Sequence, residues 1–172
     1  HGPIYDNPSF IIDAYNDWVS DETKNIVVIP YVSMHGSVRE MVGFLVKTLI
    51  EKGIEVKPFN LTNTDIGQLA ISLVDATTVV IGSPTVLTGP HPSVFYACYL
   101  FKILKPKTKF VSLIGSFGWG TNMLKMIQDM IPEGMEIIEP VIIKGYPKKN
   151  DYEKIESLAL KIMEKHKNLN LI

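Results

Sequence analysis

The chain has 172 residues, of which 46% are hydrophobic and 20% are charged, a composition that excludes an intrinsically disordered protein. This length predicts one globular domain. The 17 basic and 18 acidic residues leave a net charge of −1, and no apolar run approaches the ~20 residues of a transmembrane helix, so we expect neither a nucleic-acid nor a membrane partner.

The predicted elements begin with a β-branched run at 25–31, whose continuous apolar character is typical of a strand buried on both faces. Residues 37–52 then show apolar side chains at helical spacing, and Gly53 follows as a helix-ending glycine. The later runs predict strands at 54–59, 77–82, 109–115 and 135–143, and helices at 65–74, 91–104, 119–131 and 151–167. The one cysteine, Cys98, falls in an apolar helical pattern, where we expect a packed thiol in a cytoplasmic protein.

This alternation of five strands and five helices predicts an α/β fold, with a parallel sheet and helices on both faces as a three-layer sandwich. Ligands of such sheets bind beyond the carboxyl ends of the strands, at the point where the strand order reverses. We therefore expect the chemistry in the loops after the first, third and fourth strands.

The first of these loops contains Ser33, Met34, His35, Gly36 and Ser37. Its hydroxyls, its glycine and the free N–H groups of the following helix suit a phosphate group. The chain has no G-x-x-x-x-G-K-[ST] and no G-x-G-x-x-G at this position, which argues against a nucleoside triphosphate and against a dinucleotide. The simpler alternative is that Ser37 only caps the helix.

The other two loops combine glycines with rigid or aromatic residues. Residues 83–92 contain three prolines, and residues 116–120 place glycines beside Phe117 and Trp119. Glycines admit a close ligand, and aromatic rings pack against a flat one. Either loop alone is compatible with a turn around a buried aromatic, and Trp119 is also a candidate anchor for its own helix. Together, the three loops predict a planar, phosphorylated ligand.

Three segments carry a resemblance to a known family: YVSMHGS at 31–37, GSPTVLTG at 82–89 and GSFGWG at 115–120. Over essentially its whole length the chain resembles the flavodoxin-like FMN domain of the A-type flavoproteins, also called flavodiiron proteins. The resemblance implies FMN as cofactor and the flavodoxin-like strand order 2-1-3-4-5. By position, it implies that Ser33, Met34, His35, Gly36 and Ser37 hold the phosphate, that Pro84, Thr85, Val86, Leu87 and Gly89 line the ring, and that Ser116, Phe117, Gly118, Trp119 and Gly120 close its other side.

The N-terminal residues extend the resemblance. The stretch His-Gly-Pro-Ile at 1–4 is similar to the one that carries the last iron ligand of the family's metallo-β-lactamase-like diiron domain. His1 therefore resembles an iron ligand without its partners, and a single histidine cannot form a metal site. We expect 1–24 to be the end of a diiron domain with a linking helix at 8–18, and 25–172 to be the FMN domain.

The resemblance implies electron transfer through FMN to a diiron centre that reduces oxygen or nitric oxide. That centre is expected in cis or in the partner subunit of a homodimer, with rubredoxin or another small protein as electron donor. We see no candidate nucleophile or general base, so the isolated domain is expected to be an electron carrier. Two alternatives are a free-standing flavodoxin or FMN-dependent quinone reductase, and a flavodoxin-fold binding module without cofactor.

One residue departs from the family pattern. The family usually has a threonine after the serine at position 37, where this chain has Val38. The missing hydroxyl predicts weaker FMN binding than in relatives, by roughly 0.5–1.5 kcal/mol.

Overall fold

The computed structural model describes Gly2 and residues 4–172. His1, which resembles an iron ligand, lies outside the described residues. The elements follow in the order α1 (Pro8–Val19), β1 (Lys24–Tyr31), α2 (Ser37–Glu51), β2 (Glu55–Asn60), α3 (Ile66–Leu73), β3 (Ala76–Val86), β4 (Gly89–Pro90), α4 (Pro92–Leu104), β5 (Phe110–Phe117), α5 (Met123–Gln128), β6 (Glu136–Ile137), β7 (Val141–Lys144) and α6 (Lys149–Asn168).

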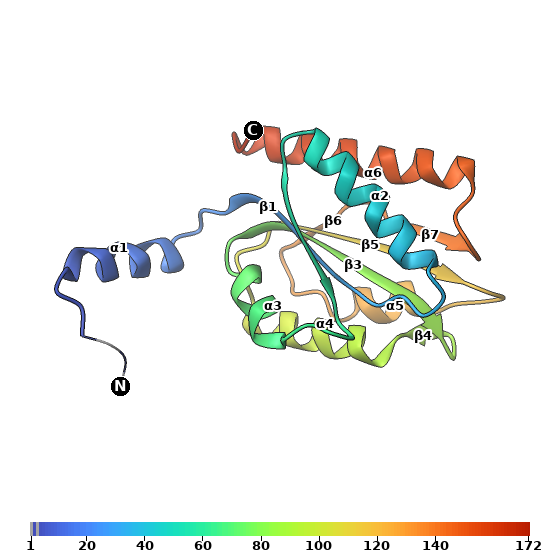
Figure 1. The fold of residues 1–172 in the computed structure, drawn as a ribbon, viewed down its shortest axis with the longest axis horizontal. Coiled ribbons are helices and arrows are strands. Elements are labelled where there is room, and N and C mark those ends of the chain that lie inside the picture. The colour runs from blue at the N-terminus through green and yellow to red at the C-terminus, as the bar shows by residue number, and fades with distance from the viewer. Residues whose placement is uncertain (1, 3) are drawn as a thin grey trace.

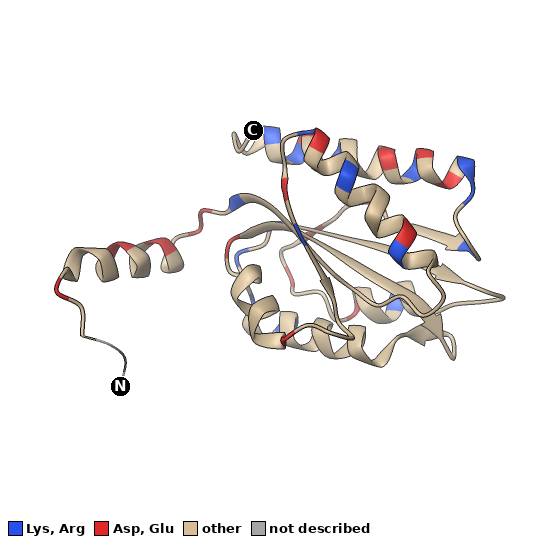
Figure 2. Cartoon of the chain, in the orientation of Figure 1, with Lys and Arg blue, Asp and Glu red and all other residues tan. Residues whose placement is uncertain are grey.

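The sheet has the order β2-β1-β3-β5-β6, and each neighbouring pair along this path is parallel. α2 and α6 cover one face, and α3, α4 and α5 cover the other (Figure 1). The charged side chains gather on α1, α2 and α6, whereas α3 and α4 are almost free of them (Figure 2). The predicted three-layer α/β class and strand order are confirmed.

The last strand of the sheet differs from the sequence prediction. The strand expected at 135–143 is divided into β6 and β7, which pair with different parts of β5 and together fill the fifth position. Pro140 lies in the interruption and has no N–H group for a strand ladder. The sheet also gains the short β4, which pairs antiparallel with an extended β3.

The helix expected at 119–131 is shorter, because α5 begins only at Met123. The hydroxyl of Thr121 accepts a hydrogen bond from the Met123 N–H at 3.0 Å, which fixes this start. Trp119 is therefore outside the helix, and the interpretation of Trp119 as a helix anchor is wrong.

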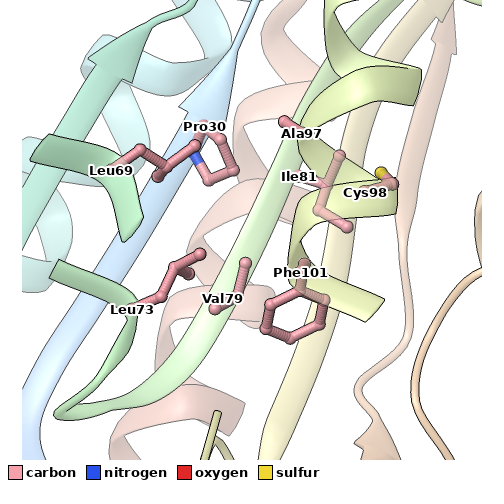
Figure 3. Close-up of a pocket in the computed structure, with 8 residues that line it drawn as sticks. All are labelled: Pro30, Leu69, Leu73, Val79, Ile81, Ala97, Cys98 and Phe101. Atoms are coloured by element: carbon pink, nitrogen blue, oxygen red, sulfur yellow. The ribbon is translucent and has the colours of Figure 1, made fainter. Parts of the chain in front are cut away.

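Each face of the sheet carries its own apolar core, because alternate residues of β1 point to opposite sides. Val27 and Ile29 pack with α2 and α6, and Val28 packs with α3 and α4. The second core includes Cys98, 3% exposed, which confirms the packed thiol. A crevice of about 10 Å³ lies in this core between the sheet, α3 and α4, lined by apolar side chains (Figure 3). A gap of this size is filled by at most one water molecule.

His166 joins α6 to the first residues of β1 and β3. Its ring is completely buried, with Nδ1 2.7 Å from Asn25 Oδ1 and Nε2 2.8 Å from Thr78 Oγ1. The amide oxygen of Asn25 can only accept, so Nδ1 donates to it and Nε2 accepts from the Thr78 hydroxyl. Burial lowers the pKa of His166 to about 4, so the ring is neutral at pH 7.

α1 stands apart from the α/β body (Figure 1), and none of its residues is buried. It is tied to the body at its end, where Lys24 Nζ lies 3.1 Å from Asp17 Oδ2 and 2.8 Å from Asp75 Oδ2. In addition, Lys107 Nζ donates to the Asp17 carbonyl at 2.9 Å. Among residues 2 and 4–172, no helix combines the length and apolar character needed to cross a membrane.

Candidate functional site

The loop after β1 delivers the N-terminus of α2 to the carboxyl edge of the sheet. Gly36 adopts φ +88°, a conformation open to glycine, and turns the chain into the helix. The N-cap residue is Gly36, and Ser33 Oγ accepts the Arg39 N–H of the first turn at 3.1 Å. The first N–H groups of a helix have no intrahelical acceptor, and for those of residues 36–38 no other acceptor is found within the described chain.

The second loop is a hairpin between β3 and β4. Its two central residues, Leu87 and Thr88, have φ of 46° and 72°, which strains a non-glycine backbone by roughly 1–2 kcal/mol per residue. The third loop holds this turn in place. The Asn122 N–H donates to the Thr88 carbonyl at 2.7 Å, and Thr85 Oγ1 lies 2.9 Å from Thr121 Oγ1.

Two glycines allow the strands that carry these loops to approach closely. A Cβ on Gly82 would lie 2.6 Å from Tyr31 Cβ, and one on Gly115 would lie 2.6 Å from the Ser83 carbonyl oxygen. Both distances are shorter than packed atoms tolerate.

A hydrogen bond links the first loop to the third. Ser37 Oγ lies 2.8 Å from Ser116 Oγ, although the two residues are far apart in the sequence. The phosphate-type loop and the aromatic loop are therefore held against each other.

The three loops enclose one cavity of about 460 Å³, a size typical of small-molecule sites, which span roughly 300–1,000 Å³. Its lining residues are Met34, His35, Ser37, Pro84, Thr85, Val86, Leu87, Thr88, Ser116, Phe117, Gly118, Trp119, Gly120, Gly145 and Tyr146. None of these described residues is an aspartate, glutamate, lysine or arginine. The cavity is therefore largely neutral, with helix N–H groups at one side.

Most of the residues predicted for the site line this cavity, and three do not. Ser33 accepts a hydrogen bond from the first turn of α2, and Gly36 shapes the turn near Tyr146, whose ring would lie 4.0 Å from a Cβ at position 36. Gly89 is buried in the hairpin, where a Cβ would lie 3.1 Å from Met126 Sδ. These three residues determine the conformation of the loops but do not line the cavity.

The sequence prediction also missed Thr88, Gly145 and Tyr146. Gly145 follows β7, and its N–H donates to the Phe117 carbonyl at 2.8 Å, which joins this fourth loop to the third. Tyr146 is 57% exposed and lies at the cavity mouth. The sequence did contain a signal for this fourth loop. A glycine is followed by an aromatic residue at the end of the last strand, as in the GSFGWG loop.

Trp119 and Leu87 stand at the mouth with most of their surface uncovered. Trp119 is 94% exposed and Leu87 is 95% exposed. They come from different loops and both line the cavity. An apolar ligand in the cavity would cover part of both side chains.

The first turn of α2 carries one basic and one acidic side chain, Arg39 and Glu40. The Arg39 guanidinium lies 3.9 Å from the position of a Cβ on Gly36. The carboxylate of Glu40 accepts the Tyr152 hydroxyl at 3.2 Å, and partial desolvation together with this carboxylate raises the pKa of Tyr152. The helix N-terminus adds its own positive potential. Within the part of the chain that the structure describes, no cluster of His, Cys, Asp or Glu could hold a metal ion.

No family model matches the chain. It is 31% identical over 166 residues to the nitric oxide reductase of Moorella thermoacetica, which is 94% of this chain and 42% of that protein. The solved structure of rubredoxin oxygen:oxidoreductase from Desulfovibrio gigas matches with a TM-score of 0.85 and 30% identity, over 93% of this chain and 40% of that chain. A flavodoxin from the domain Archaea matches with a TM-score of 0.69 and 20% identity, over 83% of this chain and 99% of that chain.

The two kinds of match differ in how much of the other protein they cover. The chain spans about 40% of the length of the curated relatives that it matches first. The archaeal flavodoxin is covered almost completely, at an identity that shows the fold alone. The chain therefore has a flavodoxin-like fold and is homologous to one part of larger oxidoreductases.

Proposed function

We propose that this chain binds FMN and serves as an electron-transfer unit. The observation that carries the proposal is the convergence of the loops after β1, β3 and β5 on one cavity of about 460 Å³. The cavity has helix N–H donors at one side and a neutral, partly aromatic lining elsewhere. FMN has the matching chemistry, an anionic phosphate joined to a planar ring system.

Different residues of the cavity would contact the phosphate and the ring of FMN. Ser37 and the N–H groups of residues 36–38 would bind the phosphate, with His35 beside them and Arg39 adding positive charge. Trp119 and Leu87 would cover the ring, and Pro84 to Val86 with Phe117 and Gly118 would line its sides. FMN supplies the redox chemistry, while these residues orient the ring and exclude water from it.

We further propose that the electrons pass to a diiron centre in a domain of the same chain or of a partner subunit in a homodimer. This is supported by relatives named as a nitric oxide reductase and a rubredoxin-oxygen oxidoreductase, of which the chain spans only about 40%. Rubredoxin or another small electron-transfer protein would be the donor, in the cytoplasm. A parent gene with a metal-binding domain before His1 would support this arrangement, and its absence would favour a free-standing flavodoxin.

The test of cofactor binding is optical. The purified chain is incubated with FMN, desalted and measured by visible absorption, and FMN and riboflavin are then titrated separately by flavin fluorescence. We expect retained flavin and at least about tenfold tighter binding of FMN, because riboflavin lacks the phosphate that the α2 N-terminus would hold. A chain that retains no flavin would contradict the proposal and favour a cofactor-free binding module.

A further inference from the structure

The turn between β3 and β4 is built from residues that do not favour its backbone conformation. Leu87 and Thr88 have φ of 46° and 72°, in the left-handed region that glycine and asparagine adopt most readily. The Leu87 side chain is 95% exposed, so its packing does not hold the turn. β4 has only two residues, and Pro90 has no N–H to donate, so the hairpin ladder is short. A strained backbone persists only where its surroundings fix it, and this turn therefore depends on bonds from another segment.

Thr121, in the third loop, supplies such bonds. Its Oγ1 accepts the Thr85 hydroxyl at 2.9 Å and the Met123 N–H at 3.0 Å, and it donates to the Thr88 carbonyl at 3.4 Å. A hydroxyl has one donor and two acceptor sites, so Thr121 uses its full hydrogen-bonding capacity. One side chain thereby joins β3, the strained turn and the start of α5.

The Thr88 carbonyl is held by two consecutive residues of the third loop. Besides the Thr121 hydroxyl, it accepts the Asn122 N–H at 2.7 Å. The two lone pairs of this carbonyl oxygen are therefore both engaged. Next to it, a Cβ on Gly89 would lie 3.1 Å from Met126 Sδ, and β4 and α5 lie side by side (Figure 1). The turn is thus fixed by α5 and the loop before it, and not by its own side chains.

The strained turn lines the cavity, whereas the residues that hold it do not. Leu87 and Thr88 belong to the lining of the cavity, and Thr121 and Asn122 do not. An apolar side chain that is almost fully exposed adds little buried area to the fold, although its backbone conformation costs free energy. Strained backbone of this kind clusters at ligand sites. The position of Leu87 is therefore explained by a ligand that it covers.

We infer that Thr121 is a positioning residue for the flavin ring, because its bonds to Thr85 and Thr88 hold Leu87 over the mouth of the cavity. The inference rests on the proposed function, since it requires a flavin ring in the cavity. Loss of the Thr121 hydroxyl lets the turn relax toward negative φ and moves Leu87 away from the ring. The phosphate end of the ligand, at the N-terminus of α2, is not affected by this change.

The experiment titrates FMN and riboflavin separately into the intact chain and into Thr121→Val, by flavin fluorescence. We expect the variant to bind both flavins about 3- to 10-fold more weakly and by the same factor, because the ring loses its cover and the phosphate does not. Thr121→Ser keeps the hydroxyl and should bind both flavins as the intact chain does. Thr62→Val is the matched control, since it removes a hydroxyl that donates to Asn60 Oδ1 at 2.9 Å in a loop outside the cavity.

A double-mutant cycle separates the positioning of Leu87 from a general loss of stability. Leu87→Ala alone should weaken the binding of riboflavin. In the Leu87→Ala background, Thr121→Val should change the affinity by less than about twofold, because its effect passes through the side chain already removed. Thr85→Val breaks the same link from β3 without removing the acceptor of the Met123 N–H, and it should reproduce the loss even if Thr121→Val does not fold.

A measurement without flavin tests the turn directly. Amide hydrogen exchange of Leu87, Thr88 and Gly89 should accelerate at least about tenfold in Thr121→Val, while the amides of β1 stay protected. An intact chain that binds neither flavin would contradict the proposed function and the inference together. Binding of FMN by the intact chain, with a Thr121→Val variant that binds both flavins equally well or loses the same affinity with and without Leu87, would overturn the inference alone.

Discussion

Ser37 is the residue that connects the two ends of the proposed ligand. Its hydroxyl bonds to Ser116 of the aromatic loop, and its N–H belongs to the helix terminus that would hold the phosphate. Ser37→Ala removes one hydroxyl hydrogen bond, with a net value of roughly 0.5–1.5 kcal/mol, so we expect FMN affinity to fall about 3- to 10-fold. Fluorescence titration measures this. Ser157→Ala, an exposed change on α6, is the control and should bind FMN as the unmodified chain does.

Val38 shows how burial changes an expectation made from sequence. The residue is completely buried in the core beneath the loop and does not line the cavity. A hydroxyl at this position faces apolar side chains, so we now expect Val38→Thr to leave FMN affinity nearly unchanged. The same change should lower the free energy of unfolding by about 1–2 kcal/mol, because it buries a polar group. Denaturant unfolding and FMN titration of one sample check both, and a severalfold gain in affinity would restore the original interpretation.

At the scale of elements, the spacing of β3 and β5 depends on Gly115. A Cβ there would lie 2.6 Å from the Ser83 carbonyl oxygen, an atom of the neighbouring strand that cannot move freely. Gly115→Ala should therefore lower the free energy of unfolding by about 2–3 kcal/mol. Gly118→Ala is a matched control, since no atom lies within 4 Å of its added Cβ. Urea unfolding measures both variants. Equal losses of unfolding free energy in Gly115→Ala and Gly118→Ala would contradict the proposed role of Gly115.

The elements that sequence predicted well are those with long hydrophobic patterns. β1 and β3 are continuous apolar runs because both of their faces are covered, and α2 shows a full amphipathic period. The sequence prediction was wrong where a single local hydrogen bond sets the boundary of an element. The start of α5 at Met123, for example, depends on the Thr121 hydroxyl. The division of β6 from β7 likewise depends on a few residues around Pro140, too short a stretch to show a period.

The residues of the candidate site also fall into those that the sequence predicted and those that it did not. The loops after the first, third and fourth predicted strands were expected from the switch-point rule, and they do line one cavity. Tyr146 was missed because its place depends on where the divided last strand ends. Gly89 was expected in the lining and is instead buried beside Met126, a contact between segments that no local pattern encodes.

At the scale of the whole molecule, stability should depend on pH through His166. Burial lowers its pKa in the folded chain to about 4, below the unfolded value of 6.5, so folding favours the neutral ring. The stabilisation is complete above pH 6.5 and is lost as the pH falls toward 4. From pH 7 to pH 4 the loss should reach about 2–3 kcal/mol, at about 1.4 kcal/mol per pKa unit.

Urea unfolding without FMN at pH 7.0 and at pH 4.5 measures this dependence. The Lys161 side chain lowers the pKa of Glu139 below its ordinary value of 4.5, and the Lys148 N–H, followed by the Lys154 side chain, lowers the pKa of Asp151 below 3.8. The stability that these carboxylates contribute is therefore lost mainly below pH 4.5. His166→Gln, which does not titrate, should flatten the change between the two pH values. An unaltered pH dependence in this variant would assign the effect to other groups.

The place of α6 has a consequence for the way the chain is made. Its His166 bonds to Asn25 and Thr78, which precede it by 141 and 88 residues. Proteins are synthesised from the N-terminus at about 5–20 residues per second, so β1 and β3 leave the ribosome several seconds before the helix that covers one of their faces. During that interval Val27 and Ile29 lack part of their cover, and a chain that stops before Lys149 keeps this surface permanently open to chaperones and to aggregation.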